Sequence, residues 1–452
     1  MSKEYLSNVS SEKFYELIPE RNKVIEAASD SFPKYDYNAN VVARELHPLI
    51  QHVIVTDVEE LNGARRYTLG PDTSSGTTKL AYFRAGQYIS LDLNIGESVL
   101  TRPYSLCSSP SESATGKYQI LVKTKADGFA SEYINKEFRK GTKLTVSSPS
   151  GFYVYEPLRD KSNVIGIAGG CGITPFMSFA RAISDGIEDF DLTLFYGSKT
   201  ESDILLKDEF DELQKKCPRI KVIYVLSDEN KEGYENGFIT KELIAKYCDI
   251  PGSSIFASGS QGLYDFVQTE LSPLNLPQKQ IRFDAYGEYK LSGRDGEFTG
   301  KHKGQTYQVT ITTKDGKTSV ISASADEPLL VAFERAGIKA PSKCRSGECG
   351  FCRSKLVSGE VYTPAKVEKR RQYDKVAGFI HPCCTFPCSD CKIQINCEEP
   401  KIERTVKDMK KKERMMGLIM AILMSAAMGA LAAFLVIKGN PDATKATPAP
   451  MD

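Results

Sequence analysis

Cysteines gathered in one stretch constrain this chain more than any other feature. The sequence contains 12 cysteines, and most of them lie between residues 344 and 397. The N-terminal stretch MSKEYLSNVSSEKFYELIPE lacks the apolar core of an export signal, so we expect no export and no oxidising compartment. Clustered cysteines in such a chain indicate metal binding rather than a disulfide framework.

Three of these cysteines lie within KCRSGECGFC. Cys344, Cys349 and Cys352 have the spacing C-x4-C-x2-C, with which one loop can wrap an iron–sulfur cluster. Intervening backbone N–H groups can point at sulfur, and the glycines of the loop allow a close approach. A fourth thiolate should come from a later strand, where Cys383 lies. Zinc is the alternative, but zinc ligands more often occur in paired C-x2-C units.

Residues 305–400 resemble the plant-type ferredoxin family. Strand-like runs and a helical run precede the cysteine loop, and HPCCTFPCSD follows it. The family pattern Cys-x3-Pro-x-Ser-Asp is matched by Cys383, Pro387, Ser389 and Asp390, so the resemblance implies Cys383 rather than Cys384 as the fourth cluster ligand. Four thiols have no place in the pattern: Cys384, Cys388, Cys391 and Cys397. We interpret them as small buried fillers, with a second metal or a redox-sensing pair as the alternative.

Upstream of residue 305, the pattern of apolar and polar residues differs between two stretches. Between about 47 and 156, short alternating runs separated by Gly, Pro and Ser predict an antiparallel β-barrel or sandwich. Between about 161 and 286, apolar strands alternate with helical stretches, which predicts a parallel sheet. The domains that we expect are a helical extension (1–45), a flavin-binding barrel (46–157), a nucleotide-binding α/β domain (158–286), a linker (287–304), the β-grasp ferredoxin domain (305–400), a basic segment (401–414), a transmembrane helix (415–437) and a polar tail (438–452).

A short motif in the β-rich part carries a second resemblance. Arg102, Tyr104 and Ser105 stand together in RPYSL, and alternation places Arg102 and Tyr104 on one side of the strand and Ser105 on the other. A guanidinium suits a phosphate and a phenol suits a flat ring. Followed by a βαβ region, the motif is similar to that of the ferredoxin–NADP reductase superfamily. The resemblance implies that Arg102 binds flavin phosphate, Tyr104 stacks on the flavin and Ser105 lies near its N5. By the same resemblance, Gly128 and Ser131 of KTKADGFAS contact flavin phosphate.

A glycine-rich loop marks the expected nucleotide site. GGCGITP, residues 169–175, follows a strand and opens a helix, where backbone N–H groups make an anion site. It is not the G-x-G-x-x-G fingerprint. It resembles the nicotinamide-nucleotide loop of the reductase family, with Thr174 on the pyrophosphate and Cys171 as a packing residue. The members of this loop assigned to the nucleotide are Gly170, Gly172, Thr174 and Pro175. The family's later Cys-Gly-Pro is replaced by Ser258-Gly259-Ser260, so Ser258 and Gly259 would line the nicotinamide site.

Charge bears on the choice of nucleotide. NADPH-using members of the reductase family carry Ser-Arg at the position where this chain has Ser227, Asp228 and Glu229. Carboxylates accept hydrogen bonds from a ribose diol and repel a 2′-phosphate. NADH is therefore the expected donor, with Lys199 a weaker argument for NADPH. FAD is the expected flavin, with FMN as the alternative.

An apolar segment lies near the C-terminus. Residues 415–437 contain no charged side chain, and as a helix they would reach about 34 Å, enough for the roughly 30 Å core of a bilayer. Basic residues crowd the preceding segment, so the positive-inside rule places the large domains in the cytoplasm. We therefore expect a single-pass C-terminal membrane anchor.

The order of these parts resembles that of the phthalate dioxygenase reductase and phenylacetate-epoxidase reductase type, and this resemblance implies a multidomain NAD(P)H-dependent oxidoreductase. Electrons would pass from NADH through flavin and [2Fe–2S] to a partner protein, which we expect at the membrane. Tyr104, Ser105 and Ser258 are the expected catalytic residues. The formal net charge of +1 gives no pull toward nucleic acid. Two other readings remain: a membrane-tethered redox sensor, or reverse flow from a reduced donor to NAD⁺.

Overall fold

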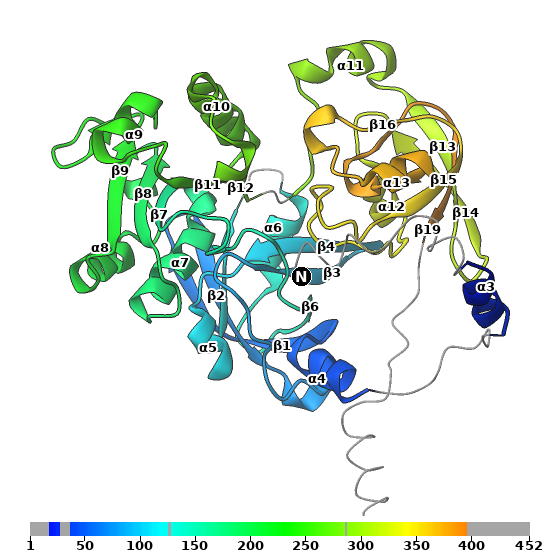
Figure 1. Cartoon of the computed structure of the whole chain (residues 1–452), viewed down its shortest axis with the longest axis horizontal. Helices are drawn as coiled ribbons and strands as arrows, with labels where there is room; N and C mark the ends of the chain where they lie inside the picture. Colours follow the sequence, from blue (N-terminus) through cyan, green and yellow to red (C-terminus); the bar gives the residue numbers. More distant parts are fainter. Residues whose placement is uncertain (1–17, 28–36, 125–127, 285–286, 396–452) are drawn as a thin grey trace, which may run out of the picture. The chain divides into compact units, whose positions relative to one another are not determined.

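The computed structural model describes residues 18–27, 37–124, 128–284 and 287–395. The chain divides into an N-terminal unit, residues 1–44, and a large unit, residues 45–452. The N-terminal unit holds helix α3 (Ile18–Ala27) and most of α4 (Asn38–Leu46), whose side chains are largely exposed. The described part of the large unit holds three large sheets and one two-stranded sheet (Figure 1).

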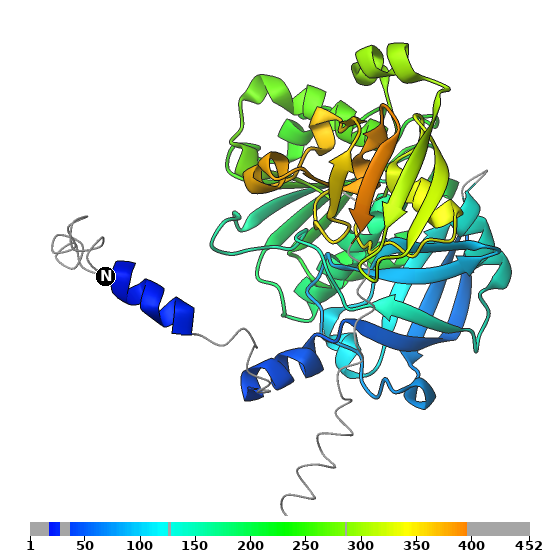
Figure 2. The same ribbon diagram turned by 90° about the vertical axis from the view of Figure 1, so that its right-hand side faces the viewer.

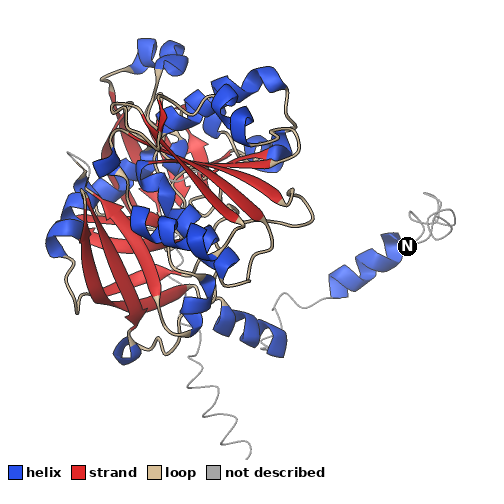
Figure 3. Cartoon of the chain, turned by 90° about the vertical axis from the view of Figure 1, so that its left-hand side faces the viewer, coloured by secondary structure: helices blue, strands red, loops and turns tan. Residues whose placement is uncertain are grey.

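The first sheet is antiparallel and curled, as its alternating sequence predicts (Figure 3). Its strands are β1 (Ile50–Leu61), β2 (Ala64–Pro71), β3 (Tyr88–Ile95), β4 (Ser98–Ser105), β5 (Tyr118–Lys123) and β6 (Lys143–Ser147), in the order β4-β3-β6-β1-β2-β5. Asn62 and Gly63 form the two-residue turn between β1 and β2, and Gly63 has φ +68°. An antiparallel bridge between Leu106 and Ile120 joins the two edges. Helices α5 (Pro110–Ala114) and α6 (Phe129–Glu137) complete this domain.

The second sheet is parallel, in the order β10-β9-β8-β7-β11-β12. Its strands are β7 (Asn163–Gly169), β8 (Asp191–Ser198), β9 (Ile220–Leu226), β10 (Glu235–Asn236), β11 (Ser254–Ser258) and β12 (Ile281–Phe283), with helices α7 (Thr174–Ser184), α8 (Lys207–Lys216), α9 (Lys241–Tyr247) and α10 (Gln261–Leu271). The interior of β7 is buried throughout, as expected for a strand covered on both faces. Strand order reverses between β7 and β11, and ligands bind beyond the carboxyl ends of strands at such a point.

The third sheet belongs to the ferredoxin-like part (Figure 2). Strands β13 (Thr306–Thr312), β14 (Thr318–Ser324), β15 (Ser354–Ser358), β17 (Phe379–Ile380) and β19 (Cys391–Ile395) take the order β14-β13-β19-β15-β17. A smaller sheet pairs β16 (Val361–Tyr362) with β18 (Phe386–Pro387). Helix α12 (Leu329–Arg335) packs its buried Leu329, Leu330 and Phe333 into the core, and α13 (Gln372–Val376) precedes β17.

The segment expected to be a linker contains helix α11 (Gly296–His302). Phe298 stacks on Tyr362 with ring centroids 4.5 Å apart, and Asp295 accepts a hydrogen bond of 2.8 Å from the Tyr362 hydroxyl. These contacts hold the segment against the ferredoxin-like part.

The predicted anchor, residues 415–437, its basic flank 401–414 and the tail 438–452 lie outside the described residues, as do Cys397 and most of the expected helical extension. No helix in the described ranges is long and apolar enough to cross a membrane.

Candidate functional site

A cavity of about 1220 Å³ opens where the three sheets of the large unit converge. The barrel contributes Tyr104 and Ser105 at the end of β4. The parallel sheet contributes the loops after β7, β8, β9 and β11, and the cysteine loop contributes Ser346 and Glu348. One cavity thus faces the residues expected to bind flavin, those expected to bind nucleotide and the loop expected to bind the cluster.

Arg102 is not among the residues that line this cavity, but it forms an ion pair with Glu288, which does line it, and another with Glu334. Its Nη2 lies 3.2 Å from Oε1 of Glu288, and its Nη1 lies 3.4 Å from Oε2 of Glu334. Arg345, next to Cys344, pairs with the same two carboxylates, with Nε 3.0 Å from Oε1 of Glu288. Arg345 is 1% exposed and has a left-handed φ of +60°. We call these four residues the ion network.

The ion network joins the predicted flavin strand to the cysteine loop. Burial lowers the pKa of Arg102, while burial and the two carboxylates act in opposite directions on Arg345, whose pKa is raised overall. Fork-shaped guanidinium groups bind phosphate as readily as carboxylate, so Arg102 could take a flavin phosphate by exchanging a partner. The sequence motif indicated Arg102 but not Glu288 or Glu334, because neither acid lies in a recognisable pattern.

Gly128 and Ser131 lie at the start of α6. Gly128 is the residue before the helix, and the Ser131 hydroxyl donates to the Gly128 carbonyl at 3.1 Å. Backbone N–H groups at this helix start suit an anion. Neither residue lines the cavity, and residues 125–127 beside them lie outside the described ranges.

The glycine-rich loop lines the cavity at the end of β7. Gly170 has φ +55°, and a Cβ at Gly172 would collide with the carbonyl oxygen of Ser258. Glycine at position 172 therefore lets the two loops of the nucleotide site touch. The Thr174 hydroxyl donates a hydrogen bond to the Cys171 carbonyl at 2.8 Å. Because its proton is engaged there, the Thr174 hydroxyl oxygen can serve a ligand only as a hydrogen-bond acceptor. Pro175 occupies the first turn of α7 and is buried.

Cys171 lines the cavity beside this loop. Burial raises the pKa of its thiol to about 11, so the group is protonated at neutral pH. A protonated thiol is a weak nucleophile, which agrees with the expected packing role.

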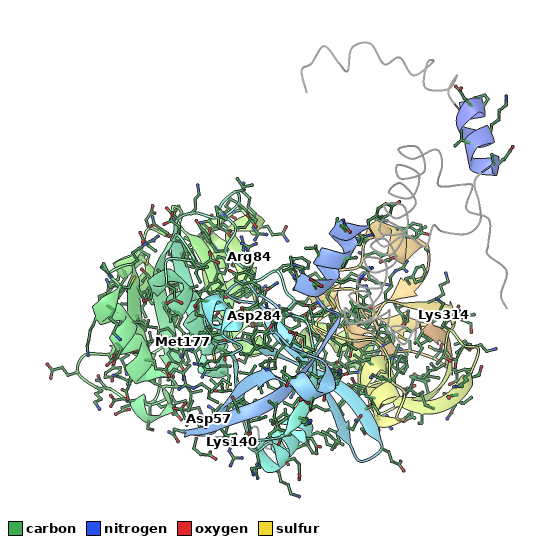
Figure 4. All side chains as sticks on the ribbon, turned by 90° about the horizontal axis from the view of Figure 1, so that it is seen from below. Asp57, Arg84, Lys140, Met177, Asp284 and Lys314 are labelled. Atoms are coloured by element: carbon green, nitrogen blue, oxygen red, sulfur yellow. The ribbon has the colours of Figure 1, made fainter. Side chains whose placement is uncertain are left out.

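Ser258 is fully buried, and its hydroxyl donates to Oδ2 of Asp284 at 3.3 Å. The Ser105 hydroxyl donates to the same oxygen at 3.2 Å. Asp284, labelled in Figure 4, therefore links two residues that the sequence assigned to opposite cofactors. Burial raises its pKa to about 7, with the two hydroxyls opposing that rise. The sequence carried no signal for Asp284, since one acid after a strand has no distinguishing spacing.

The end of β9 places Ser227 in the cavity lining, and the end of β8 places Lys199 there. The Ser227 hydroxyl donates to Asp228 at 2.6 Å, and Glu229 accepts from the Glu201 backbone N–H at 2.8 Å. Gly259 also lines the cavity, whereas Ser258 does not.

The four predicted cluster ligands lie as two neighbouring pairs. The sulfurs of Cys352 and Cys383 are 3.4 Å apart, and the Cys349 backbone N–H donates to the Cys344 sulfur at 3.4 Å. A hydrogen bond from the Cys349 thiol lowers the pKa of Cys344. A [2Fe–2S] cluster takes two protein ligands on each of two irons, so two pairs fit it. Within the described ranges, no three His, Cys, Asp or Glu side chains are grouped to hold a single metal ion.

Backbone groups of the loop also suit sulfur ligands. The Ser346 N–H points at the Cys344 sulfur at 3.5 Å, and the Phe351 N–H points at the Cys349 sulfur at 3.4 Å. Gly347 and Gly350 have φ +81° and +68°, and a Cβ at Gly347 would collide with Cys384 and the Val367 carbonyl.

The surplus thiols in the described part of the ferredoxin-like domain are packed. Cys384 and Cys391 are buried, and Cys388 is half-buried against Tyr289, Phe298 and their neighbours. Cys384 contacts the carbonyls of His381 and Val367 at 3.5 and 3.8 Å rather than Cys352. The pKa of Cys388 is raised to about 11 by burial.

Three family models match the chain in succession. Residues 49–155 match the oxidoreductase FAD-binding domain, residues 167–269 the oxidoreductase NAD-binding domain, and residues 312–388 the 2Fe-2S iron-sulfur cluster binding domain. Each match coincides with one of the three sheets described above.

Curated relatives agree with this order. The chain is 27% identical over 363 residues to the ferredoxin reductase component of 3-ketosteroid-9-alpha-monooxygenase from Mycobacterium tuberculosis, covering 78% of this chain and 98% of the relative. It is 32% identical over 201 residues to NADH-cytochrome b5 reductase 1 of Candida glabrata, covering 43% of this chain and 69% of the relative.

A solved structure shares the fold. Phthalate dioxygenase reductase, described as a modular structure for electron transfer from pyridine nucleotides to [2Fe–2S], matches with a TM-score of 0.54 and 21% identity, over 77% of this chain and 98% of that one. The likeness includes the curled antiparallel sheet, the nucleotide domain and the ferredoxin domain. The chain therefore belongs to the ferredoxin reductase-type oxidoreductases, as an electron-transfer enzyme with FAD, NAD(P)H and [2Fe–2S] sites.

Proposed function

We propose that this protein oxidises NADH and delivers single electrons to the oxygenase component of a multicomponent system. The main support for this proposal is the cavity, which is lined by the end of strand β4, the nucleotide loops and the cysteine loop. The relative from Mycobacterium tuberculosis, named as the reductase component of a monooxygenase, supports the choice of partner. When bound, the flavin takes two electrons as hydride from NADH and releases them singly through the cluster.

The chain's own residues hold and align these groups. Arg102 binds the flavin phosphate together with Gly128 and Ser131, and Tyr104 packs against the flavin ring. Ser105 lines the transfer site, Ser258 supports it from the buried side, and Asp284 accepts a hydrogen bond from each of the two hydroxyls. Hydride transfer depends on the alignment of two rings, so rigid placement is the main contribution of these residues.

The nucleotide lies across the loops after β7, β9 and β11. Gly170, Gly172, Thr174 and Pro175 hold its pyrophosphate, and Gly259 approaches the nicotinamide. Ser227 and the adjacent acids hold the adenine ribose. Asp228 is exposed and near this edge, so a 2′-phosphate would be repelled. We expect a higher kcat/KM for NADH than for NADPH; a higher value for NADPH would contradict the proposed role of Asp228.

Cys344, Cys349, Cys352 and Cys383 ligate the cluster, as the two thiol pairs support. The apolar segment 415–437 anchors the protein in the membrane with its domains on the cytoplasmic side. Tethering raises the local concentration of a membrane-bound acceptor.

Anaerobic titration of the full-length holoprotein with NADH tests the proposal. Flavin absorbance and the electron paramagnetic resonance signal of the reduced cluster are recorded together. We expect the flavin to bleach and the cluster signal to develop in wild type. In Cys352→Ser, the flavin should still bleach while the [2Fe–2S] signal is lost. Flavin that does not bleach with NADH, or a wild-type cluster that stays oxidised after flavin reduction, would overturn the proposal.

A further inference from the structure

Three exposed apolar side chains lie on the cysteine loop and on helix α13, which an ion pair joins to the end of that loop. Phe351, between Cys349 and Cys352, is 47% exposed, and Tyr373 and Val376 of α13 are 71% and 79% exposed. Large apolar side chains this exposed are common singly, but several beside a redox site mark an interaction surface. Helix α13 is labelled in Figure 1.

Helix α13 is fixed to the loop by an ion pair. Arg353, the residue after Cys352, donates from Nε to Oδ1 of Asp374 at 2.7 Å. The Arg353 guanidinium also stacks on the Phe379 ring, 3.3 Å from its centroid. The apolar residues of α13 therefore hold a defined position relative to the predicted cluster ligand Cys352.

The same surface is positively charged. Arg371 and Lys375 are exposed, and within the described residues neither forms an ion pair. Lys343 adds a cation 4.6 Å from the centroid of the Phe351 ring. We define the cluster face as Phe351, Tyr373 and Val376 together with these cations: Lys343, Arg371 and Lys375.

The acids near the cluster face are already engaged. Asp374 pairs with Arg353, and Glu368 pairs with Arg370. Glu348 is exposed on the cysteine loop, but it lines the cavity together with Lys369, so neither of these two residues belongs to the cluster face. The excess of positive charge on the cluster face is therefore not balanced by its own neighbours.

We infer that the cluster face is the docking surface for an acidic electron-acceptor protein. An apolar centre surrounded by cations fits a partner with an apolar patch inside a ring of carboxylates. Opposite charges speed encounter and fix orientation, while the apolar centre excludes water beside the exit from Cys349 and Cys352. The inference rests on the proposed function, since it identifies the chemistry of the acceptor for the same electron route.

A binding experiment with two haem proteins of opposite charge tests the inference. The full-length oxidised holoprotein in detergent is titrated, without NADH, with the acidic soluble haem domain of cytochrome b5 and separately with basic cytochrome c. Biolayer interferometry at low and high ionic strength gives the dissociation constants. We expect the acidic domain to bind, more weakly at high salt, because ions screen charges beyond about 10 Å at 0.1 M. Basic cytochrome c should bind far more weakly.

Charge reversal locates the surface. Arg371→Glu with Lys375→Glu should weaken binding of the acidic domain by about tenfold or more, because two facing charges change sign. Lys301→Glu with Lys303→Glu, the same charge change on and after the exposed end of α11, should leave binding within about twofold. Tyr373→Ala should weaken binding without altering its salt dependence.

NADH–ferricyanide turnover separates this inference from the proposed function. All three variants should keep wild-type ferricyanide reduction, since none touches the cavity. Absent ferricyanide turnover in wild type defeats the proposed function, whatever the binding data show. Equal binding of the acidic domain by wild type and Arg371→Glu/Lys375→Glu, or stronger binding of basic cytochrome c by wild type, overturns the docking surface.

Discussion

At the residue scale, the most consequential group is one that carries no motif. Asp284 is buried, no cation in the described part of the chain forms an ion pair with it, and it accepts hydrogen bonds from Ser105 and Ser258 at 3.2 and 3.3 Å. A buried carboxyl with two hydroxyl donors keeps both hydroxyls pointed at one place. Its raised pKa follows from that burial.

The titration of Asp284 should appear in the pH dependence of stability. Burial raises its pKa from 3.8 to about 7. The folded protein thus holds a proton that the unfolded chain has released, so stability present below about pH 4 is lost as the pH rises toward 7. Asp284→Asn cannot ionise, and its unfolding free energy relative to wild type should therefore rise between about pH 5 and pH 8, by at most about 3 kcal/mol. Urea unfolding at both pH values measures the change; a difference independent of pH contradicts it.

Substitution of the two adjacent cysteines, Cys383 and Cys384, should have different effects on cluster binding. Cys383→Ser should lose the cluster, because the Cys383 sulfur lies 3.4 Å from that of Cys352. Cys384→Ser should keep it, because the Cys384 sulfur faces the His381 and Val367 carbonyls instead. Iron and acid-labile sulfide per protein, with the electron paramagnetic resonance signal, distinguish the two. Loss of the cluster in Cys384→Ser alone would reverse the assignment.

At the element scale, strand β4 and the cysteine loop are held together by charge. The Thr101 and Ser342 hydroxyls hydrogen bond to each other beside the ion network, and the Ser90 hydroxyl donates to the Lys343 carbonyl at 3.3 Å. Breaking one member of a buried ion network leaves its partner desolvated and underpaired, which costs more than losing a surface ion pair.

Glu288→Gln tests the ion network. The substitution removes the carboxylate shared by Arg102 and Arg345, and we expect the unfolding free energy to fall by about 1–3 kcal/mol. Flavin reduction by NADH should stay fast in stopped-flow experiments while cluster reduction slows. Glu297→Gln, at an exposed site on α11, is the matched control and should change stability by less than about 0.5 kcal/mol. Unchanged stability and cluster reduction in Glu288→Gln would show that the network does not hold the loop.

At the scale of the whole molecule, three domains share one cavity and the predicted anchor follows them in sequence. The order FAD-binding, NAD-binding, 2Fe-2S places the cluster domain last before the basic segment 401–414. A bilayer anchor there would keep the exit of electrons near the membrane surface.

Removal of residues 401–452 tests the anchor. Full-length protein should sediment with membranes and need detergent for release, because the apolar segment 415–437 prefers hydrocarbon. The shortened protein should remain in the supernatant with the same NADH–ferricyanide turnover. Full-length protein that stays in the supernatant without detergent would contradict membrane anchoring.

The sequence by itself determined the classes of structure and chemistry. Alternation and turn residues such as Asn62 and Gly63 indicated an antiparallel sheet, and the spacing of Cys344, Cys349 and Cys352 indicated a cluster, because these are contacts within a few residues. Only the tertiary structure decided that Asp284 joins Ser105 to Ser258, and that Arg102 shares its carboxylates with Arg345. Those contacts join residues far apart in the chain, and burial, which raises the pKa of Asp284, arises only when the domains close around it.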